Sequence, residues 1–138
     1  MELKLPSLSV NEGFARSVVG AFATQLDPTL EEVADIKTAV SEAVTNAIVH
    51  AYPKTVGEIA IRASLFGNTL VVSVADAGVG IQDISQARQP FFSTAGDESR
   101  SGMGFTVMET FMDKVSVTSV PGQGTVVEMT KIVHSQEN

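Results

Sequence analysis

The sequence contains no cysteine and only two histidines among its 138 residues. The absence of cysteine excludes disulfide bonds, thiolate zinc sites and cysteine nucleophiles, and two histidines are too few for a His-rich metal site. No apolar run approaches the ~20 residues of a membrane-spanning helix. The N-terminus alternates Leu3 and Leu5 with polar residues and lacks the apolar centre of a signal peptide. We therefore expect a cytoplasmic protein with no membrane span.

Basic residues are also few, because nine Lys and Arg stand against sixteen Asp and Glu, for a net charge of −7. This balance disfavours broad attraction to nucleic acid or to an anionic membrane and suits a basic protein partner better. The hydrophobic content of 43% is enough for one core, which would bury about two-thirds of the surface that the unfolded chain exposes. With no repeat, low-complexity tract or linker, we expect residues 1–138 to form a single domain.

Apolar periodicity predicts a strand, two long helices, a hairpin, a polar segment, a short helix and two final strands. Pro6 confines the first strand to a sheet edge or to a pairing that leaves this position free. Ser9 with Glu12, and Thr29 with Glu32, have the spacing of a capping box and predict the starts of the two long helices. The predicted ranges are 2–8, 10–26, 30–50, 57–66, 70–76, 105–112, 114–120 and 125–133.

The second long helix carries Glu42 and Asn46 one turn apart, on the face opposite its apolar stripe, with His50 one further turn along. A carboxylate there can take a proton or orient a hydroxyl, and a carboxamide oxygen can ligate a hard cation. Solvated polar residues would show the same spacing. For His50 we favour a structural or helix-terminal role.

Two glycine-containing segments follow. Asp76, Gly78 and Gly80 stand where a buried strand leaves the sheet, a position that allows a tight turn with close backbone approach and that also fits an ordinary turn. Residues 101–104, Ser-Gly-Met-Gly, precede a helix, where backbone N–H groups can approach a phosphate, although a flexible loop end is the simpler explanation. Between them, residues 79–101 are polar and aperiodic and predict a mobile lid.

The order and separation of these pieces resemble the nucleotide site shared by gyrase, Hsp90, histidine kinase and MutL ATPases. The late Gly124-Thr125 pair, which enters a strand, belongs to the same pattern. Residues 42–52, Glu-Ala-Val-Thr-Asn-Ala-Ile-Val-His-Ala-Tyr, together with the lid segments 88–94 and 100–105, resemble the anti-sigma factor serine kinases of spore-forming bacteria. This resemblance covers nearly the whole chain.

The resemblance implies a Bergerat-type ATP-binding fold, a two-layer α/β (α+β) sandwich whose mixed, mostly antiparallel sheet is covered on one face by helices. Mg-ATP would lie between the helices and the sheet, beneath the lid. At matching positions, Asn46 would ligate Mg²⁺, Asp76 would accept a hydrogen bond from the adenine amino group, and Thr125 would complete the adenine-side network. Glu42 would act as general base or orient the attacking serine hydroxyl.

Glycines and lid residues would complete the site that the resemblance implies. Gly78 and Gly80 would make room for the base and its entry loop. The cofactor-binding backbone donors to the phosphates would be Gly102, Met103 and Gly104. Arg88 and Arg100 are candidate lid cations for the phosphates. The acidic lid segment 95–99 has no assigned role.

In function, the resemblance implies an anti-sigma factor that binds and inhibits a sporulation sigma factor of the sigma F type. Such a protein also phosphorylates a serine of an anti-anti-sigma factor with Mg-ATP, and it is a homodimer. Arg16, a lone cation on the first helix, matches a partner-contact position, and we hypothesise that it is a docking residue shared by both partners.

Three alternatives remain open at this point. The chain could be a nucleotide-gated sigma-binding module without kinase activity, although Glu42 argues against a pure binder. It could be an anti-sigma kinase for a stress-response sigma factor. It could also be the catalytic piece of a histidine kinase, which is disfavoured because a phosphoacceptor hairpin would have to precede a first helix that begins by about residue 10.

Overall fold

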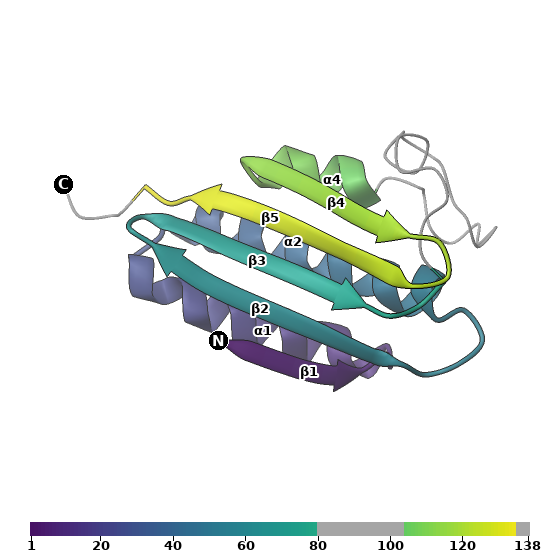
Figure 1. Ribbon diagram of the computed structural model, residues 1–138. Helices are drawn as coiled ribbons and strands as arrows, with labels where there is room; N and C mark the ends of the chain where they lie inside the picture. The colour runs from purple at the N-terminus through teal and green to yellow at the C-terminus, as the bar shows by residue number, and fades with distance from the viewer. Residues whose placement is uncertain (80–103, 135–138) are drawn as a thin grey trace.

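The computed structural model describes residues 1–79 and 104–134. One layer is a five-stranded sheet, and the helices cover one of its faces (Figure 1). The strands are β1 (Glu2–Pro6), β2 (Glu58–Phe66), β3 (Thr69–Asp76), β4 (Lys114–Val120) and β5 (Gly124–Ile132), in the order β1-β2-β3-β5-β4. All four pairings between these strands are antiparallel. The two-layer α/β sandwich is confirmed, and in the described part of the chain the sheet is antiparallel throughout rather than mixed.

The helical layer consists of α1 (Val10–Ala23), the 3₁₀ turn η1 (Thr24–Leu26), α2 (Leu30–Asn46), the π-helical turn η2 (Ala47–Ala51) and α4 (Gly104–Phe111). The capping box predicted at the start of α2 is confirmed: the Thr29 hydroxyl accepts from the Glu32 N–H at 3.1 Å, and the Glu32 carboxylate accepts from the Thr29 N–H at 2.9 Å. The one predicted for α1 is wrong, because the Ser9 side chain makes no capping hydrogen bond.

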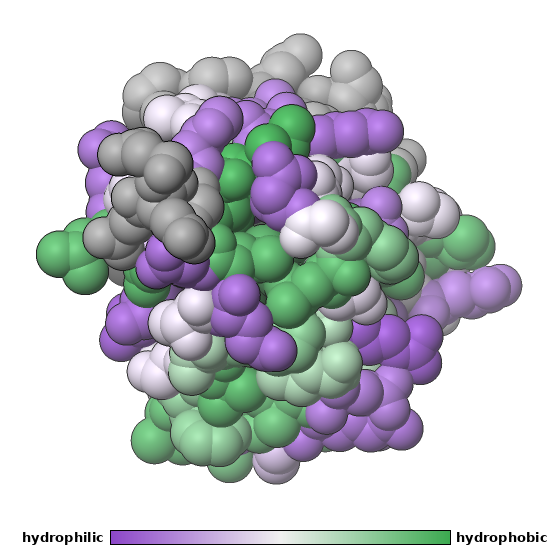
Figure 2. All heavy atoms as spheres, turned by 90° about the vertical axis from the view of Figure 1, so that its left-hand side faces the viewer, coloured by the Kyte–Doolittle hydropathy of each residue, from purple (hydrophilic) through white to green (hydrophobic). Residues whose placement is uncertain are grey.

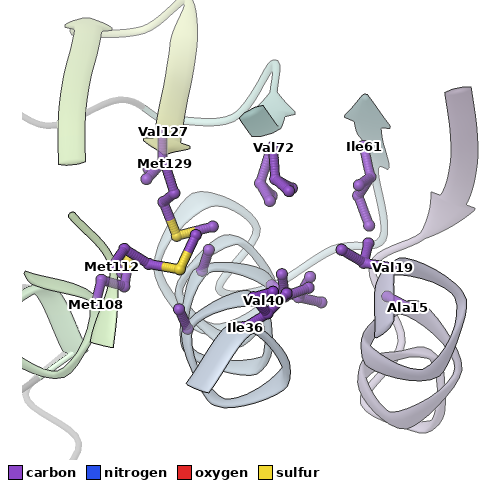
Figure 3. Close-up of a cluster of buried hydrophobic side chains, with 14 of the residues drawn as sticks. Ala15, Val19, Ile36, Val40, Ile61, Val72, Met108, Met112, Val127 and Met129 are labelled. Atoms are coloured by element: carbon purple, nitrogen blue, oxygen red, sulfur yellow. The ribbon is translucent and has the colours of Figure 1, made fainter. Parts of the chain in front are cut away.

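The core lies between the sheet and the helices, where apolar side chains from every layer meet (Figure 3). Alternate residues of β2, β3 and β5 point at the helices, which is why strand alternation predicted these elements correctly. Residues in contact there include Ala15 and Val19 of α1, Ile36 and Val40 of α2, Ile61, Val72, Val127 and Met129 of the sheet, and Met108 and Met112 in and after α4.

Only part of the apolar repeat of the first helix lies on the face that α1 buries; this repeat consists of Val10, Phe14, Val18, Ala21, Phe22 and Leu26. Val10 and Phe14 are 76% and 54% exposed, whereas Ala15 is fully buried. The small residues face inward because α1 packs closely on α2: a Cβ added to Gly20 would lie 2.6 Å from Cε of Lys37. Val10 and Phe14 are left on the surface, whereas Phe22 and Leu26 pack partly against the core.

The two ends of the molecule differ. The end that carries the β2–β3 turn exposes Phe66, Ile132 and Leu30, and Figure 2 shows an apolar surface there, bordered by hydrophilic side chains. At the opposite end, β3 finishes, β5 begins and α2 ends (Figure 1). Within the described residues, no helix is long and apolar enough to cross a membrane.

Candidate functional site

The last turns of α2 carry the polar residues that the sequence singled out. Glu42 and Asn46 lie on successive turns and are both half-buried, and Asn46 is the final residue of the α-helix. The chain then widens into the π-helical turn Ala47–Ala51, which contains His50. This turn was not predicted, and π-helical turns are often found at functional sites. It supports the helix-terminal role expected for His50.

Asn46 meets the start of α4, although 58 positions separate it from Gly104 in the sequence. A Cβ built on Gly104 would lie 3.0 Å from Nδ2 and 3.1 Å from Oδ1 of Asn46. The carboxamide therefore rests against the Gly104 backbone, and the glycine makes this approach possible. Two predicted site residues from different elements are thus brought together.

Asp76 is the last residue of β3, where it pairs with Ile59 on one side and Thr125 on the other. Its Oδ1 accepts hydrogen bonds from the Gly78 N–H at 3.0 Å and the Thr125 N–H at 3.2 Å. Oδ2 has no hydrogen-bond partner in the described part of the chain. Burial raises the pKa of the Asp76 carboxyl, and the two N–H donors oppose this shift without cancelling it. One carboxylate oxygen is thus held in place while the other can accept from a ligand.

The loop after Asp76 packs on the end of η2. The Val79 N–H donates to the Ala51 carbonyl at 3.1 Å. A Cβ on Gly78 would lie 2.2 Å from that same carbonyl oxygen, so only glycine fits without a shift of the backbone. The close approach expected at Gly78 is therefore real, but the structure that approaches is the end of η2.

Thr125 joins the site from the start of β5 and is buried. Its hydroxyl lies 2.8 Å from the hydroxyl of Ser119 on β4, which also donates to the Gly124 carbonyl at 3.1 Å. Gly124 has a φ of +119°, and a Cβ there would lie 2.1 Å from the Asp76 carbonyl oxygen. The two strands can meet here only because residue 124 is glycine.

Tyr52 is the last residue of segment 42–52, which carries the family resemblance, but no role was predicted for it from the sequence. Its hydroxyl accepts from the Ala77 N–H at 2.8 Å and donates to the Glu58 carbonyl at 2.8 Å. Ser119 was missed as well. Both side chains act on backbone groups or on a neighbouring hydroxyl, and such contacts leave no spacing pattern in a sequence.

The structure does not place the other predicted site residues in this cluster, for two different reasons. Gly80, Arg88, Arg100, Gly102 and Met103 lie outside the described residues, as does almost all of the predicted lid. Arg16 lies on α1, and its Nη1 is 3.4 Å from Oε1 of Glu12. The same carboxylate oxygen accepts from the Ser41 hydroxyl on α2. Arg16 is thus the only cation of its helix but not an isolated charge.

Comparison with known proteins agrees with this architecture. The family model described as a histidine kinase-like ATPase domain matches residues 6–131. Among solved structures, the crystal structure of the RsbU and RsbW domains of a Mycobacterium tuberculosis protein superposes with a TM-score of 0.69 at 21% identity, covering 96% of this chain and 31% of that one. A blue-light activated histidine kinase of Erythrobacter litoralis gives 0.61 at 23% identity, covering 91% and 42%. These two likenesses concern the fold alone.

Curated relatives are much more similar in sequence. A Caldanaerobacter subterraneus protein named anti-sigma F factor is 60% identical over 133 residues, which cover 96% of this chain and 93% of the relative. Proteins of the same name from a Thermoanaerobacter species and from Bacillus subtilis are 58% and 49% identical, covering 99% and 95% of this chain and 96% and 90% of theirs. With a histidine kinase-like ATPase fold and this identity along nearly its full length, the chain belongs to the anti-sigma F factor family.

Proposed function

We propose that this chain is an ATP-dependent protein serine kinase that also binds and inhibits a sigma factor. It would use Mg-ATP to phosphorylate a serine of an anti-anti-sigma factor, and its sigma factor would be a sporulation factor of the sigma F type. One observation carries the proposal: Asn46, Asp76, Thr125 and Gly104, from four separate elements, gather at one end of a histidine kinase-like ATPase domain, with Glu42 one turn before Asn46.

Adenine recognition would depend on Asp76. Its Oδ1 is held by the N–H groups of Gly78 and Thr125, which leaves Oδ2 to accept from the exocyclic amino group of adenine. The buried Thr125 hydroxyl, paired with that of Ser119, would extend this polar network along the base. Gly80 would keep space for the base, whereas Gly78 lets the loop after Asp76 pack against Ala51. A carboxylate held in advance loses little freedom on binding, which favours affinity and specificity.

Phosphate and metal binding would fall to the ends of α2 and α4. No group of three or more His, Asp or Glu in residues 1–79 and 104–134 could hold a metal ion unaided. A single carboxamide oxygen from Asn46 fits Mg²⁺, which is often held by one or two protein oxygens together with phosphates and water. When bound, the ion would neutralise phosphate charge. Backbone N–H groups at Gly102, Met103 and Gly104, with Arg88 and Arg100, would contact the phosphates.

Glu42 would be the residue that acts on the protein substrate. It lies one helical turn from Asn46 and is half-buried, which supports placing its carboxylate near the proposed phosphate end of the site. There it would orient the serine hydroxyl and accept its proton. Phosphoryl transfer depends mainly on positioning and on electrostatic stabilisation, so one acceptor-orienting carboxylate is sufficient.

Partner binding would use the outer surface of α1. Val10 and Phe14 expose most of their surface there, and Arg16 lies on the same helix. Aromatic side chains and arginine are both enriched at protein interfaces. We propose that Arg16 contacts both partners, that the kinase acts as a cytoplasmic homodimer, and that residues 1–138 form one domain.

The decisive experiment is phosphotransfer from γ-labelled Mg-ATP to an anti-anti-sigma protein. Wild type is compared with Glu42→Gln and with Glu31→Gln, which makes the same change at the exposed first turn of the same helix. We expect wild type and Glu31→Gln to label the partner serine. The rate of phosphotransfer should fall at least ~100-fold in Glu42→Gln, while the affinity of this variant for ATP is unchanged.

Each other outcome has a definite meaning. Tight ATP binding without transfer by wild type would contradict the kinase and point to a nucleotide-gated sigma-binding module. Full transfer by Glu42→Gln would remove Glu42 from catalysis. Capture of a stress-response sigma factor in preference to a sporulation factor would correct the partner. For docking, Arg16→Ala should weaken the capture of both partners while ATP affinity is retained, and unchanged capture would remove Arg16 from the interface.

A further inference from the structure

Tyr52 links three segments at the edge of the site. It follows η2 directly, its hydroxyl donates to the Glu58 carbonyl at the start of β2, and the same oxygen accepts from the Ala77 N–H just after Asp76, each at 2.8 Å. The end of the central helix is thereby connected to the residue that follows the proposed adenine-binding carboxylate.

The peptide group between Asp76 and Ala77 is consequently held from both sides. Its N–H is bound by the Tyr52 hydroxyl. Its carbonyl oxygen is in close contact with the backbone of Gly124, because a Cβ built on Gly124 would lie only 2.1 Å from this oxygen. The Asp76 side chain is held separately, by the N–H groups of Gly78 and Thr125. Without Tyr52, the N–H side of this peptide would lose its only partner in the described part of the chain.

The position of the tyrosine ring is itself well determined. A Cβ on Gly57 would lie 2.2 Å from Cε1 of the ring, so the ring lies directly against the Gly57 backbone. That backbone cannot move away easily, because the Gly57 N–H donates to the Ser7 hydroxyl at 2.9 Å and its carbonyl accepts from the Ser7 N–H at 2.8 Å. The ring also packs against the hydrophobic core. The hydroxyl is therefore presented to Ala77 from a rigid support.

We infer that Tyr52 is a positioning residue for nucleotide specificity, which holds the Asp76–Ala77 peptide so that Asp76 can distinguish adenine from other bases. The inference rests on the proposed function, because it assigns Tyr52 a part in ATP recognition through Asp76. Tyr52 itself does not need to touch the nucleotide.

The test compares the affinities for ATP and for inosine triphosphate, in which an oxygen replaces the adenine amino group. Tyr52→Phe keeps the ring and removes the hydroxyl. Gly57→Ala keeps the hydroxyl and displaces the ring. Thr38→Val is the matched control, because it removes a hydroxyl that donates to a backbone carbonyl, that of Ala34 at 2.9 Å, at an exposed position of α2 away from the site.

We expect wild type and Thr38→Val to prefer ATP. In Tyr52→Phe and Gly57→Ala, the Kd for ATP should rise about three- to tenfold, while the Kd for inosine triphosphate changes little, so that the preference falls. If the role of Tyr52 were purely structural, the variants would bind both nucleotides more weakly by the same factor. Binding is measured by calorimetry at a temperature at which thermal melts show that the variants are folded. If only one variant folds, the ratio of its Kd for inosine triphosphate to its Kd for ATP decides the test.

Two other results are distinguishable. Unchanged preference in the variants that fold, against a wild type that prefers ATP, would overturn the role of Tyr52 and leave the proposed function intact. A wild type that binds neither nucleotide, or binds both equally, would instead contradict the proposed adenine recognition by Asp76.

Discussion

Replacement of Gly78 by alanine tests whether the loop after Asp76 depends on close packing against the central helix. The φ of Gly78 lies outside the left-handed range, so alanine could adopt its backbone conformation. The whole effect should therefore come from contact: the new Cβ would lie 2.2 Å from the Ala51 carbonyl oxygen and 2.6 Å from its carbon. Both of these Ala51 atoms belong to the backbone, so no flexible side chain can move aside to relieve the contact.

The size of the effect follows from this overlap. Ordinary van der Waals contact begins near 3.4 Å, so the loop and η2 would have to separate by about 1 Å. This movement would break the Val79 N–H hydrogen bond to Ala51, which is 3.1 Å long. Overpacking of this kind costs about 1–3 kcal/mol of the free energy of unfolding. For a domain of this size, the melting temperature should fall by about 4–12 °C.

Urea unfolding measures the stability, and calorimetry measures the affinity for ATP. Gly13→Ala on α1 is the control, because its new Cβ would meet nothing nearer than Nη2 of Arg16 at 3.4 Å, and it should be neutral or more stable by about 0.5–1 kcal/mol. We expect Gly78→Ala to lose stability without a change in m and to bind ATP at least ~10-fold more weakly. If Gly78→Ala matched Gly13→Ala in both assays, the packing of this loop on Ala51 would be refuted.

Three further changes test other parts of the site and the fold. Gly104→Ala should leave the fold stable but move the Asn46 carboxamide by a few tenths of an ångström, because the new Cβ would lie 3.0 Å from it. Phosphotransfer should then slow by ~10-fold, and an unchanged rate would contradict a role for the contact between Asn46 and Gly104. Burial raises the pKa of Asp76 above its unfolded value, so the folded state binds the proton more tightly, and the contribution of Asp76 to stability is greatest at low pH and falls as the pH rises through the folded pKa. Asp76→Asn should therefore be at least as stable as wild type at neutral pH, with a flatter pH profile in urea unfolding, yet lose ATP affinity; lower stability at neutral pH would contradict this reasoning. Lys131→Met removes an ammonium that lies 3.4 Å from Asp35 and donates to the Phe111 carbonyl at 2.7 Å, on a side chain that is only 13% exposed. The change should lower the free energy of unfolding in urea by about 1–2 kcal/mol, whereas unchanged stability would show that these two contacts together add nothing.

Local patterns accounted for most of the fold. The alternation in β2 and β3 predicted a hairpin that the structure confirms, and the capping box at Thr29 located the start of α2 to the residue. These predictions succeeded because strand alternation and helix capping depend on neighbours in the sequence. The apolar repeat of the first helix did not decide which side of α1 is buried, because the choice between Phe14 and Ala15 depends on how closely α2 approaches.

The sequence by itself predicted the candidate site residues, through the order and separation of Glu42, Asn46, Asp76 and Thr125. Only the tertiary structure decided how these residues are held. It placed Gly104 against Asn46 and showed that Tyr52 binds the peptide after Asp76. The physical reason is that such contacts join backbone groups of segments far apart in the chain. A backbone N–H or carbonyl is the same in almost every residue, so its partner is set by the fold and leaves no mark in the sequence.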